Sequence, residues 1–228
     1  MKILWICFVW PEPDSSAAGT RTIELLNILK NAGHEIRVCS PCQPNSYKEA
    51  LSNLGFITEY QAANDSRFDT FIEQYQPDIV FFDRFVIEEQ FSWRVRQYCP
   101  DALRVLDTID LHSLRRARQR KVQEGLDARE LSIPDLQSED AIREIAAIYR
   151  SDLSLIVSDF EIEFLQRNYN LSDSLLALCR FSSSKLEIVP SFEERCHFVS
   201  IGNFNHAPNI DSIKVLQENI WAEIKVRL

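Results

Sequence analysis

Short apolar runs alternate with helical patterns along most of the chain. The runs are rich in β-branched and aromatic residues, and they lie at residues 3–10, 35–40, 78–83, 104–110, 153–158 and 186–190. Their apolar positions are nearly continuous, which is typical of strands that are buried on both faces of a sheet. Each run is therefore expected to form a strand of a parallel sheet.

Amphipathic stretches between these runs predict helices. Ile23, Leu26 and Leu29 recur at helical spacing, and Gly33 follows them where a helix would end. Apolar stripes of the same kind occur within residues 68–75 and 91–98. Strands and helices that alternate in this way favour an α/β fold with a doubly wound, mainly parallel sheet.

Composition narrows the classes of protein to consider. The chain has 228 residues, and 45% of them are hydrophobic, which is enough for a globular core. It has 25 Lys and Arg against 34 Asp and Glu, and this net charge of −9 argues against a general nucleic-acid surface. No apolar run is long enough to cross a bilayer.

Two features imitate signals of other protein classes. Residues 2–18 follow the order of a secretory signal, but the apolar run is short, and Glu12 and Asp14 precede the supposed cleavage site. The strand interpretation is therefore favoured, and a cytoplasmic location is expected. Cys39 and Cys42 form a C-x-x-C without a second pair or a downstream His cluster, so reduced thiols are expected rather than a metal site.

The stretch PEPDSSAAGTRT, residues 11–22, joins the first strand to the first helix. Ligands of doubly wound sheets bind beyond the carboxyl ends of the strands, where helix N-termini present free N–H groups. Small side chains at Ala18 and Gly19, with Arg21 nearby, would let a diphosphate approach the backbone. The stretch matches neither G-x-G-x-x-G nor a P-loop, and a plain turn of small residues explains it equally well.

The stretch LDTIDLHSLRRARQRK, residues 106–121, has the highest density of chemically active side chains. Asp107, Asp110 and His112 are expected at the carboxyl end of a strand, where a carboxylate or an imidazole can act as a general base or hold a sugar hydroxyl. Arg115 lies within the first turn of the following helix, nearest to this edge. The later basic residues suit a solvated helix face, which the acid-rich stretch 124–144 would neutralise.

Ser158 and Glu161 have the spacing of a capping box at the end of an apolar run. They predict a helix that begins there and continues toward Tyr169. Capping alone accounts for both residue types.

The chain resembles the glycosyltransferase family 4-like group over nearly its whole length. The segments that carry the resemblance are, in order, PEPDSSAAGTRT, LLNILKNAGHEIRVCSP, VLDTIDLHSLRRAR, DLSLIVSDFEIEFL, LEIVP and FVSIGNFNHAPNIDSIKVLQENIW. The resemblance implies the GT-B fold, in which two Rossmann-like domains face each other across a cleft. It also implies a hexosyltransferase that moves a sugar from a nucleotide-diphosphate donor to an acceptor with retained anomeric configuration, and that needs no cofactor or metal beyond this donor substrate.

The resemblance also assigns roles to residues. Ala18, Gly19 and Arg21 would lie beside the donor diphosphate. Asp110 and His112 would be catalytic, although Asp110 stands where many members of the family have a histidine. The remaining acceptor or cleft positions would be Asp107, Arg115, Ser158 and Glu161.

The resemblance divides the chain at residue 195. Residues 1–195 would form the acceptor-side domain, and residues 196–228 would form the first strand and helix of a truncated donor-binding domain, with Asn203, Asn205 and His206 in its loop. Because most of a donor site would be missing, no sugar transfer is expected from these residues alone. Affinity for a nucleotide diphosphate is expected to be millimolar or weaker.

Other functions remain open at this point. The chain could be a non-catalytic α/β binding or assembly module, or one half of a split transferase whose protein partner docks on the C-terminal helix at an exposed Trp221. Peripheral membrane association is also left open, whereas a nucleic-acid partner is not expected. The unknown acceptor is the remaining partner to identify.

Overall fold

The computed structural model describes residues 1–182, 189–204 and 207–227, and it consists of two compact units. Unit 1 comprises residues 1–13 and 17–182, and unit 2 comprises residues 14–16 and 183–228. Three of the expected features lie outside the described residues. They are the first part of the strand at 186–190, Asn205 and His206.

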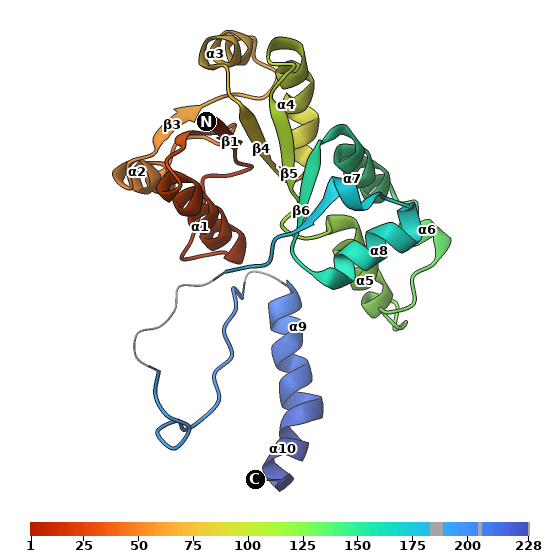
Figure 1. Cartoon of the computed structure of the whole chain (residues 1–228). Helices are drawn as coiled ribbons and strands as arrows, with labels where there is room; N and C mark the ends of the chain where they lie inside the picture. Colours follow the sequence, from red (N-terminus) through yellow and green to blue (C-terminus); the bar gives the residue numbers. More distant parts are fainter. Residues whose placement is uncertain (183–188, 205–206, 228) are drawn as a thin grey trace. The chain divides into compact units, whose positions relative to one another are not determined.

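Unit 1 is built on a parallel sheet, which confirms the expected fold class (Figure 1). Within the described residues the sheet has seven strands in the order β3-β2-β1-β4-β5-β6-β7, and all of its neighbouring strands are parallel. Their bounds are β1 Lys2–Ile6, β2 Glu35–Ser40, β3 Ile57–Tyr60, β4 Ile79–Asp83, β5 Leu103–Asp107, β6 Leu153–Ile156 and β7 Leu176–Leu178.

The first strand ends earlier than its apolar run. β1 stops at Ile6, although apolar residues continue to Trp10. The backbone N–H of Phe8 donates to the Asp83 carboxylate at 2.9 Å instead of to a neighbouring strand. The indole Nε1–H of Trp10 donates to the carbonyl oxygen of Cys42 at 3.1 Å. The second half of the run therefore turns away from the sheet, and within it Trp10 is buried whereas Phe8 is exposed.

The two strands at the edges of the sheet have no counterpart among the predicted runs. β3 has the sequence ITEY and β7 has the sequence LAL. Among the described strands each pairs with one neighbour, and none of the four side chains of β3 is fully buried. An edge strand needs fewer apolar residues than a central one, so its hydrophobic pattern is weak.

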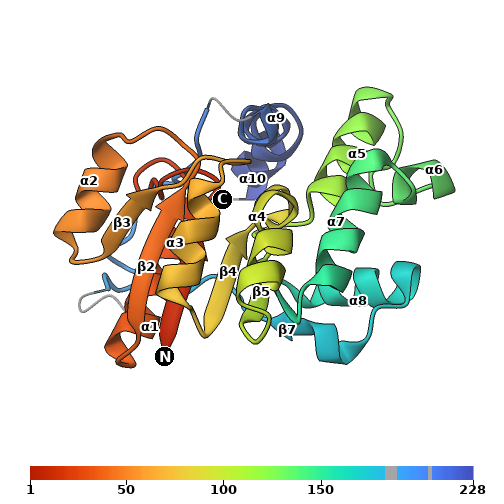
Figure 2. The ribbon, with the colours of Figure 1, turned by 90° about the horizontal axis from the view of Figure 1, so that it is seen from above.

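Helices cover both faces of the sheet, so the unit has three layers (Figure 2). The helices of unit 1 are α1 Ala17–Asn31, α2 Ser46–Asn53, α3 Arg67–Tyr75, α4 Phe85–Tyr98, α5 His112–Gln123, α6 Ile133–Leu136, α7 Glu139–Arg150, α8 Asp159–Tyr169 and the short η1 Asp173–Leu175. On one face, Leu4 and Ile6 of β1 pack with residues of α3, α4, α7 and α8. On the other face, Ile3 and Trp5 pack with residues of α1 and α2.

The predicted start of α8 and the predicted neutralisation of the α5 basic residues are confirmed, whereas the capping box at Ser158 forms only in its Ser158 half, because the Glu161 carboxylate binds the N–H of Leu111. Ser158 is the N-cap of α8, and its side chain accepts a hydrogen bond from the backbone N–H of Glu161 at 3.2 Å. The later basic residues of α5 face acidic partners. They pair as Arg116 with Asp140, and as Arg120 and Lys121 with Asp135.

Unit 2 contains one helical rod, and its described residues lack the expected strand. The rod consists of α9 Ala207–Val215, the π-helical turn η2 Leu216–Ile220 and α10 Trp221–Arg227. Residues 196–204 form no strand, because the described part of this unit offers no second strand to pair with. Trp221 is half-buried rather than exposed, since its ring packs edge-on against Phe198 at 5.5 Å. No described helix is long and apolar enough to cross a membrane.

Gly19 lies where the first turn of α1 meets the preceding loop. A Cβ at this position would lie 2.4 Å from the backbone N and C atoms of Glu12, well inside van der Waals contact. Residue 19 is buried, and Thr20 fixes the same approach by donating from its hydroxyl to the carbonyl of Pro13 at 3.0 Å. The glycine is therefore required for close packing of two backbone segments.

Gly19→Ala is expected to destabilise unit 1 by about 2 kcal/mol or more, because backbone atoms cannot move aside as a flexible side chain can. Urea denaturation followed by circular dichroism measures this change. The control is Ala17→Ser, at an exposed position in the same turn, which is expected to change stability by less than about 0.5 kcal/mol. Equal stability of Gly19→Ala and the wild type would show that this packing is wrong.

Candidate functional site

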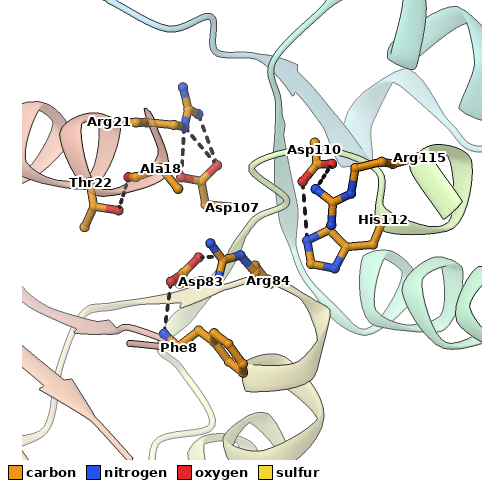
Figure 3. A network of polar contacts seen from close by, with 10 residues as sticks. All are labelled: Phe8, Ala18, Arg21, Thr22, Asp83, Arg84, Asp107, Asp110, His112 and Arg115. Carbon is orange, nitrogen blue, oxygen red and sulfur yellow. Dashed lines mark hydrogen bonds and ion pairs between the residues drawn. The ribbon is translucent and has the colours of Figure 1, made fainter. Parts of the chain in front are cut away.

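The order of the strands places three carboxyl ends side by side. β1 lies between β2 and β4. The chain adds β2 and β3 on one side of β1 and the later strands, from β4 to β7, on the other side. Ile6 of β1 pairs with Phe82 of β4, and Asp83 pairs with Asp107 of β5. Such a switch point is where doubly wound sheets bind ligands. Figure 3 shows the polar side chains that gather there.

Arg21 and Asp107 form a fully buried ion pair. The exposed fractions of their side chains are 1% and 0%. Nε of Arg21 lies 3.1 Å from Oδ2 of Asp107, and its second terminal nitrogen lies 3.1 Å from Oδ1, so the pairing is bidentate. The contact joins the second turn of α1 to the end of β5 (Figure 3).

The rest of the Arg21 guanidinium binds the chain after β7. Its first terminal nitrogen donates to the carbonyl oxygens of Cys179 at 2.7 Å and Arg180 at 3.1 Å. The guanidinium also lies 5.3 Å from the centre of the Phe181 ring. Arg21 thus ties three distant segments together, and its role beside a donor diphosphate stays a prediction.

Ala18 and Gly19 contribute backbone atoms to the same turn. The carbonyl of Ala18 accepts a hydrogen bond from the Thr22 hydroxyl at 3.0 Å (Figure 3). The absence of a side chain at Gly19 leaves room for the backbone of Glu12, as described above. Packing therefore explains Gly19, and diphosphate binding at this turn remains an expectation.

Burial dominates the electrostatics of Asp107. Removal from water raises the pKa of its carboxyl group, and the hydrogen bonds and positive charge of Arg21 oppose this effect. The negative charge of Asp83 adds to the rise. Asp107 therefore depends on Arg21 for its stability in the ionised form.

Asp110, His112 and Arg115 form a second, more accessible group beyond the end of β5. Oδ1 of Asp110 lies 3.3 Å from Nε2 of His112, and its Oδ2 accepts a hydrogen bond from Arg115 (Figure 3). The exposed fraction of the Asp110 side chain is 29%, and that of Arg115 is 40%. The ring of His112 packs edge-on against Phe85 at 5.7 Å, which fixes its plane. The structure thus brings together both residues that were expected to be catalytic and one expected cleft residue.

Partial burial and neighbouring charges act in opposite directions on Asp110. Burial raises the pKa of its carboxyl group, but the hydrogen bond and charge of His112 and the charges of Arg115 and Arg84 outweigh it. The pKa of Asp110 therefore lies below its ordinary value.

Two buried carboxylates hold the N-terminus of α5. Glu144 of α7 accepts hydrogen bonds from the backbone N–H of His112 at 2.9 Å and of Ser113 at 3.1 Å, and also from the Ser113 hydroxyl. Glu161 of α8 accepts from the backbone N–H of Leu111 at 3.2 Å. Carboxylates are stabilised at a helix N-terminus. Burial nevertheless raises the pKa of both groups.

Ser158 and Glu161 thus have structural tasks in this arrangement. Ser158 caps α8, and the Glu161 carboxylate reaches the loop that precedes α5. Together with Glu144 they position His112 at the sheet edge. The sequence could not show the contact of Glu144, because its partners lie 31 and 32 residues away without periodic spacing.

A third group lies at the carboxyl ends of β1 and β4. Oδ2 of Asp83 accepts the backbone N–H of Phe8, and its Oδ1 lies 3.7 Å from Nε of Arg84. The Arg84 guanidinium lies 5.2 Å from the centre of the Phe8 ring. Sequence reasoning missed Phe8, Asp83 and Arg84 as site residues. Their signal was present, because Asp83 and Arg84 close the apolar run that became β4.

The backbone is strained at this edge. Arg84 has φ 73° and ψ 158°, and Ile109, just beyond β5, has φ 63°. Neither residue is a glycine, and a β-branched side chain at positive φ is uncommon. Non-glycine residues in such conformations cluster at functional sites. The N–H of Arg84 donates to the carbonyl of Asp107 at 2.9 Å, and this hydrogen bond holds the backbone of Arg84 in place.

The remaining expected site residue with described structure is Asn203. It belongs to unit 2, where its side chain donates to the carbonyl of Ser15 at 3.3 Å. Among the residues that the structure describes, no group of three or more His, Cys, Asp or Glu side chains is arranged to hold a metal ion.

Comparisons with known proteins place the fold. No protein-family model matches the chain, and no curated protein sequence matches it significantly. Among solved structures, the lipopolysaccharide outer core galactosyltransferase WaaB in its apo form is similar with a TM-score of 0.57 and 12% identity over 86% of this chain. Sucrose-phosphate synthase from Thermosynechococcus elongatus is similar with a TM-score of 0.52 and 12% identity over 78% of this chain.

These similarities confirm the expected GT-B-like fold and extend no further than the fold, because the identity is low. The chain spans about half the length of the solved structures that it matches, 50% and 48% respectively. The fold of unit 1 is therefore glycosyltransferase-like.

Arg21→Ala is expected to destabilise unit 1 by about 3–5 kcal/mol, because it leaves the Asp107 carboxylate buried without a partner. Denaturant unfolding measures the loss. The double variant Arg21→Met with Asp107→Leu is expected to recover much of it. The control Arg116→Ala removes an exposed ion pair and is expected to change stability by about 1 kcal/mol or less. A similarly small loss for Arg21→Ala would contradict the importance of the buried pair.

Asp110 gives unit 1 a pH-dependent stability. Because its folded pKa is lowered, its contribution is present above the unfolded value of about 3.9 and is lost as pH falls through the lower folded value. Wild type is therefore expected to exceed Asp110→Asn in stability near neutral pH, and this difference is expected to shrink toward pH ~2. Urea denaturation across this range measures it, with exposed Asp101→Asn as control. A difference that is constant with pH would contradict the assignment.

Proposed function

We propose that unit 1 provides the acceptor side of a sugar-transfer site, and that the donor is a nucleotide-diphosphate sugar. The glycosyltransferase-like fold supports the reaction class. The observation that carries the proposal is the Asp110–His112 pair at the switch-point edge, with its contact at 3.3 Å. No part of this assignment depends on a metal ion.

The geometry of the pair suits His112 to accept a proton. When Nε2 of a neutral imidazole donates to the Asp110 carboxylate, Nδ1 carries the lone pair. The contact with Asp110 uses Nε2 and does not involve Nδ1. The negative charge of Asp110 stabilises the imidazolium that forms, and the Glu144 contact with the His112 backbone keeps the residue in position.

The proposed step balances as a group transfer. The acceptor hydroxyl oxygen attacks the anomeric carbon, and its proton passes to Nδ1 of His112. The bond from the anomeric carbon to the diphosphate oxygen breaks, and its electron pair leaves with the nucleoside diphosphate. By the resemblance, attack occurs on the face from which the diphosphate departs, so that the anomeric configuration is retained.

The other predicted roles enter the proposal with different weight. Arg115 holds Asp110 and lies at the accessible edge, so it acts as a cleft residue. Ala18, Gly19 and Arg21 are proposed to present the first turn of α1 to the donor, with Arg21 acting through the structure it ties together rather than through a free guanidinium. Docking of a protein on α9–α10 stays a prediction.

His112→Gln is expected to lower the rate of sugar transfer by about 10²–10⁴-fold, because the proton acceptor is lost. Because no transfer is expected from these residues alone, the rate is measured with the chain combined with a donor-binding half, as transfer of a radiolabelled sugar from a panel of nucleotide-diphosphate donors to a mixture of acceptors. His34→Gln is the matched control, since His34 precedes β2 at the opposite edge of the sheet.

Nitrogen-15 NMR of the imidazoles tests the pair without a donor. The neutral ring of His112 is expected to carry its proton on Nε2, and Asp110→Asn is expected to weaken this preference. A proton on Nδ1 in the wild type, or transfer that is unchanged in His112→Gln, would exclude the proposed base.

A further inference from the structure

The proton transfer proposed above makes no use of the third group at the sheet edge, Phe8, Asp83 and Arg84. Phe8 is 41% exposed, although it follows a strand whose last four residues are fully buried. The side chain of Arg84 is 19% exposed and lies over the Phe8 ring (Figure 3). The switch point thus has an exposed aromatic ring beneath a guanidinium, and neither side chain has a role in the proposed proton transfer.

Asp83 fixes the two side chains relative to each other. Its carboxylate binds the backbone N–H of Phe8 through Oδ2 and approaches Nε of Arg84 through Oδ1. Asp83 is 5% exposed, and its Oδ1 accepts no hydrogen bond from the described residues. The buried Asp83 carboxylate therefore fixes both the Phe8 backbone and the Arg84 guanidinium. The positive φ of Arg84 adds a second constraint.

The side-chain N–H groups of Arg84 have no hydrogen-bond acceptor among the described residues. In the part of the chain that the structure describes, its guanidinium makes one ion pair at 3.7 Å and no hydrogen bond. Arg21 and Arg150, by contrast, each donate several hydrogen bonds to carboxylate or carbonyl oxygens. A guanidinium that is four-fifths buried with unused N–H groups points to a ligand that supplies oxygen acceptors.

The charges at the edge favour a neutral ligand. Arg84 and Arg115 are balanced by Asp83 and Asp110, so the group has no excess positive charge for a phosphate or a carboxylate. Arg84 is also close enough to Asp110 for its charge to lower the pKa of that carboxyl group. Carboxylates accept hydrogen bonds from hydroxyl groups, guanidinium groups donate hydrogen bonds to hydroxyl oxygens, and an aromatic ring packs against an apolar C–H face. A pyranose ring has hydroxyl donors, oxygen acceptors and an apolar C–H face.

We infer that Phe8 and Arg84 form an acceptor subsite for a neutral sugar ring, which packs against the exposed part of the Phe8 ring beside the guanidinium and receives hydrogen bonds from Arg84. This inference rests on the proposed sugar-transfer function and names the acceptor class of that site. The subsite places the sugar ring near Asp110 and His112. A hydroxyl group of this sugar would then be the reacting acceptor group.

Saturation-transfer NMR and titration with the 228-residue chain test the subsite. The probes are the methyl pyranosides of glucose, galactose, mannose and N-acetylglucosamine, with glucuronate and glucose 6-phosphate as anionic counterparts. At least one neutral probe is expected to bind in the millimolar range, more tightly than its anionic counterpart. Phe8→Ala and Arg84→Ala are each expected to weaken this binding at least about tenfold.

Controls separate loss of the subsite from loss of the fold. Phe8→Leu keeps apolar packing without an aromatic face and is expected to weaken binding like Phe8→Ala, with an unchanged amide spectrum. Trp93→Ala removes an exposed aromatic ring that also lies under a guanidinium, that of Arg94 at 4.6 Å, and is expected to leave binding unchanged. Failure of all neutral probes to bind, tighter binding of the anionic probes, or binding that survives in Phe8→Ala and Arg84→Ala would each overturn the inference.

The outcomes also distinguish this inference from the proposed function. Sugar transfer that depends on His112 but uses an acceptor without a sugar ring would overturn the subsite and leave the transferase assignment intact. Neutral-sugar binding that depends on Phe8 and Arg84, without transfer that depends on His112, would support the subsite and overturn the catalytic assignment.

Discussion

The buried ion pair between Arg21 and Asp107 is the constraint on which the candidate site depends. Two opposite charges with side-chain exposures of 1% and 0% are stable only in contact, so α1 and the end of β5 must meet at one point. The same guanidinium binds the carbonyl groups after β7, which links the middle of the sheet to one of its edges. The carboxyl edge is thereby held by a contact that is itself inaccessible to a ligand.

Accessible chemistry is consequently displaced to the neighbouring positions. Asp110, His112 and Arg115 follow the buried pair along the chain, and Phe8 and Arg84 lie at the adjacent strand ends. Each group has a carboxylate that other parts of the structure hold in place. Glu144 and Glu161 supply the same support from α7 and α8 to the N-terminus of α5. Buried carboxylates therefore preorganise this edge of the sheet, and its exposed side chains remain accessible to a ligand.

Much of the fold could be predicted from the sequence, because strands buried on both faces have continuous apolar runs and helices have periodic ones. The edge strands β3 and β7 could not be predicted in this way, since a strand with one neighbour has little apolar pattern. The positions of Asp110, His112 and Arg115 also followed from strand ends. The partner of Arg21 did not, because Asp107 is 86 residues away, and no local pattern distinguishes a ligand-binding arginine from one in a buried ion pair. Gly19 shows the same limit, since close backbone packing and ligand approach both require a small residue.

The central claim is that ligands bind at the carboxyl ends of β1, β4 and β5. Amide chemical-shift mapping of the chain during titration with a methyl glucopyranoside tests it most directly, because it locates binding without assuming a reaction. The account predicts shifts clustered at residues 7–10, 83–85 and 108–115. Shifts clustered at the opposite edge of the sheet, around His34, Asp78 and Asp152, would contradict it.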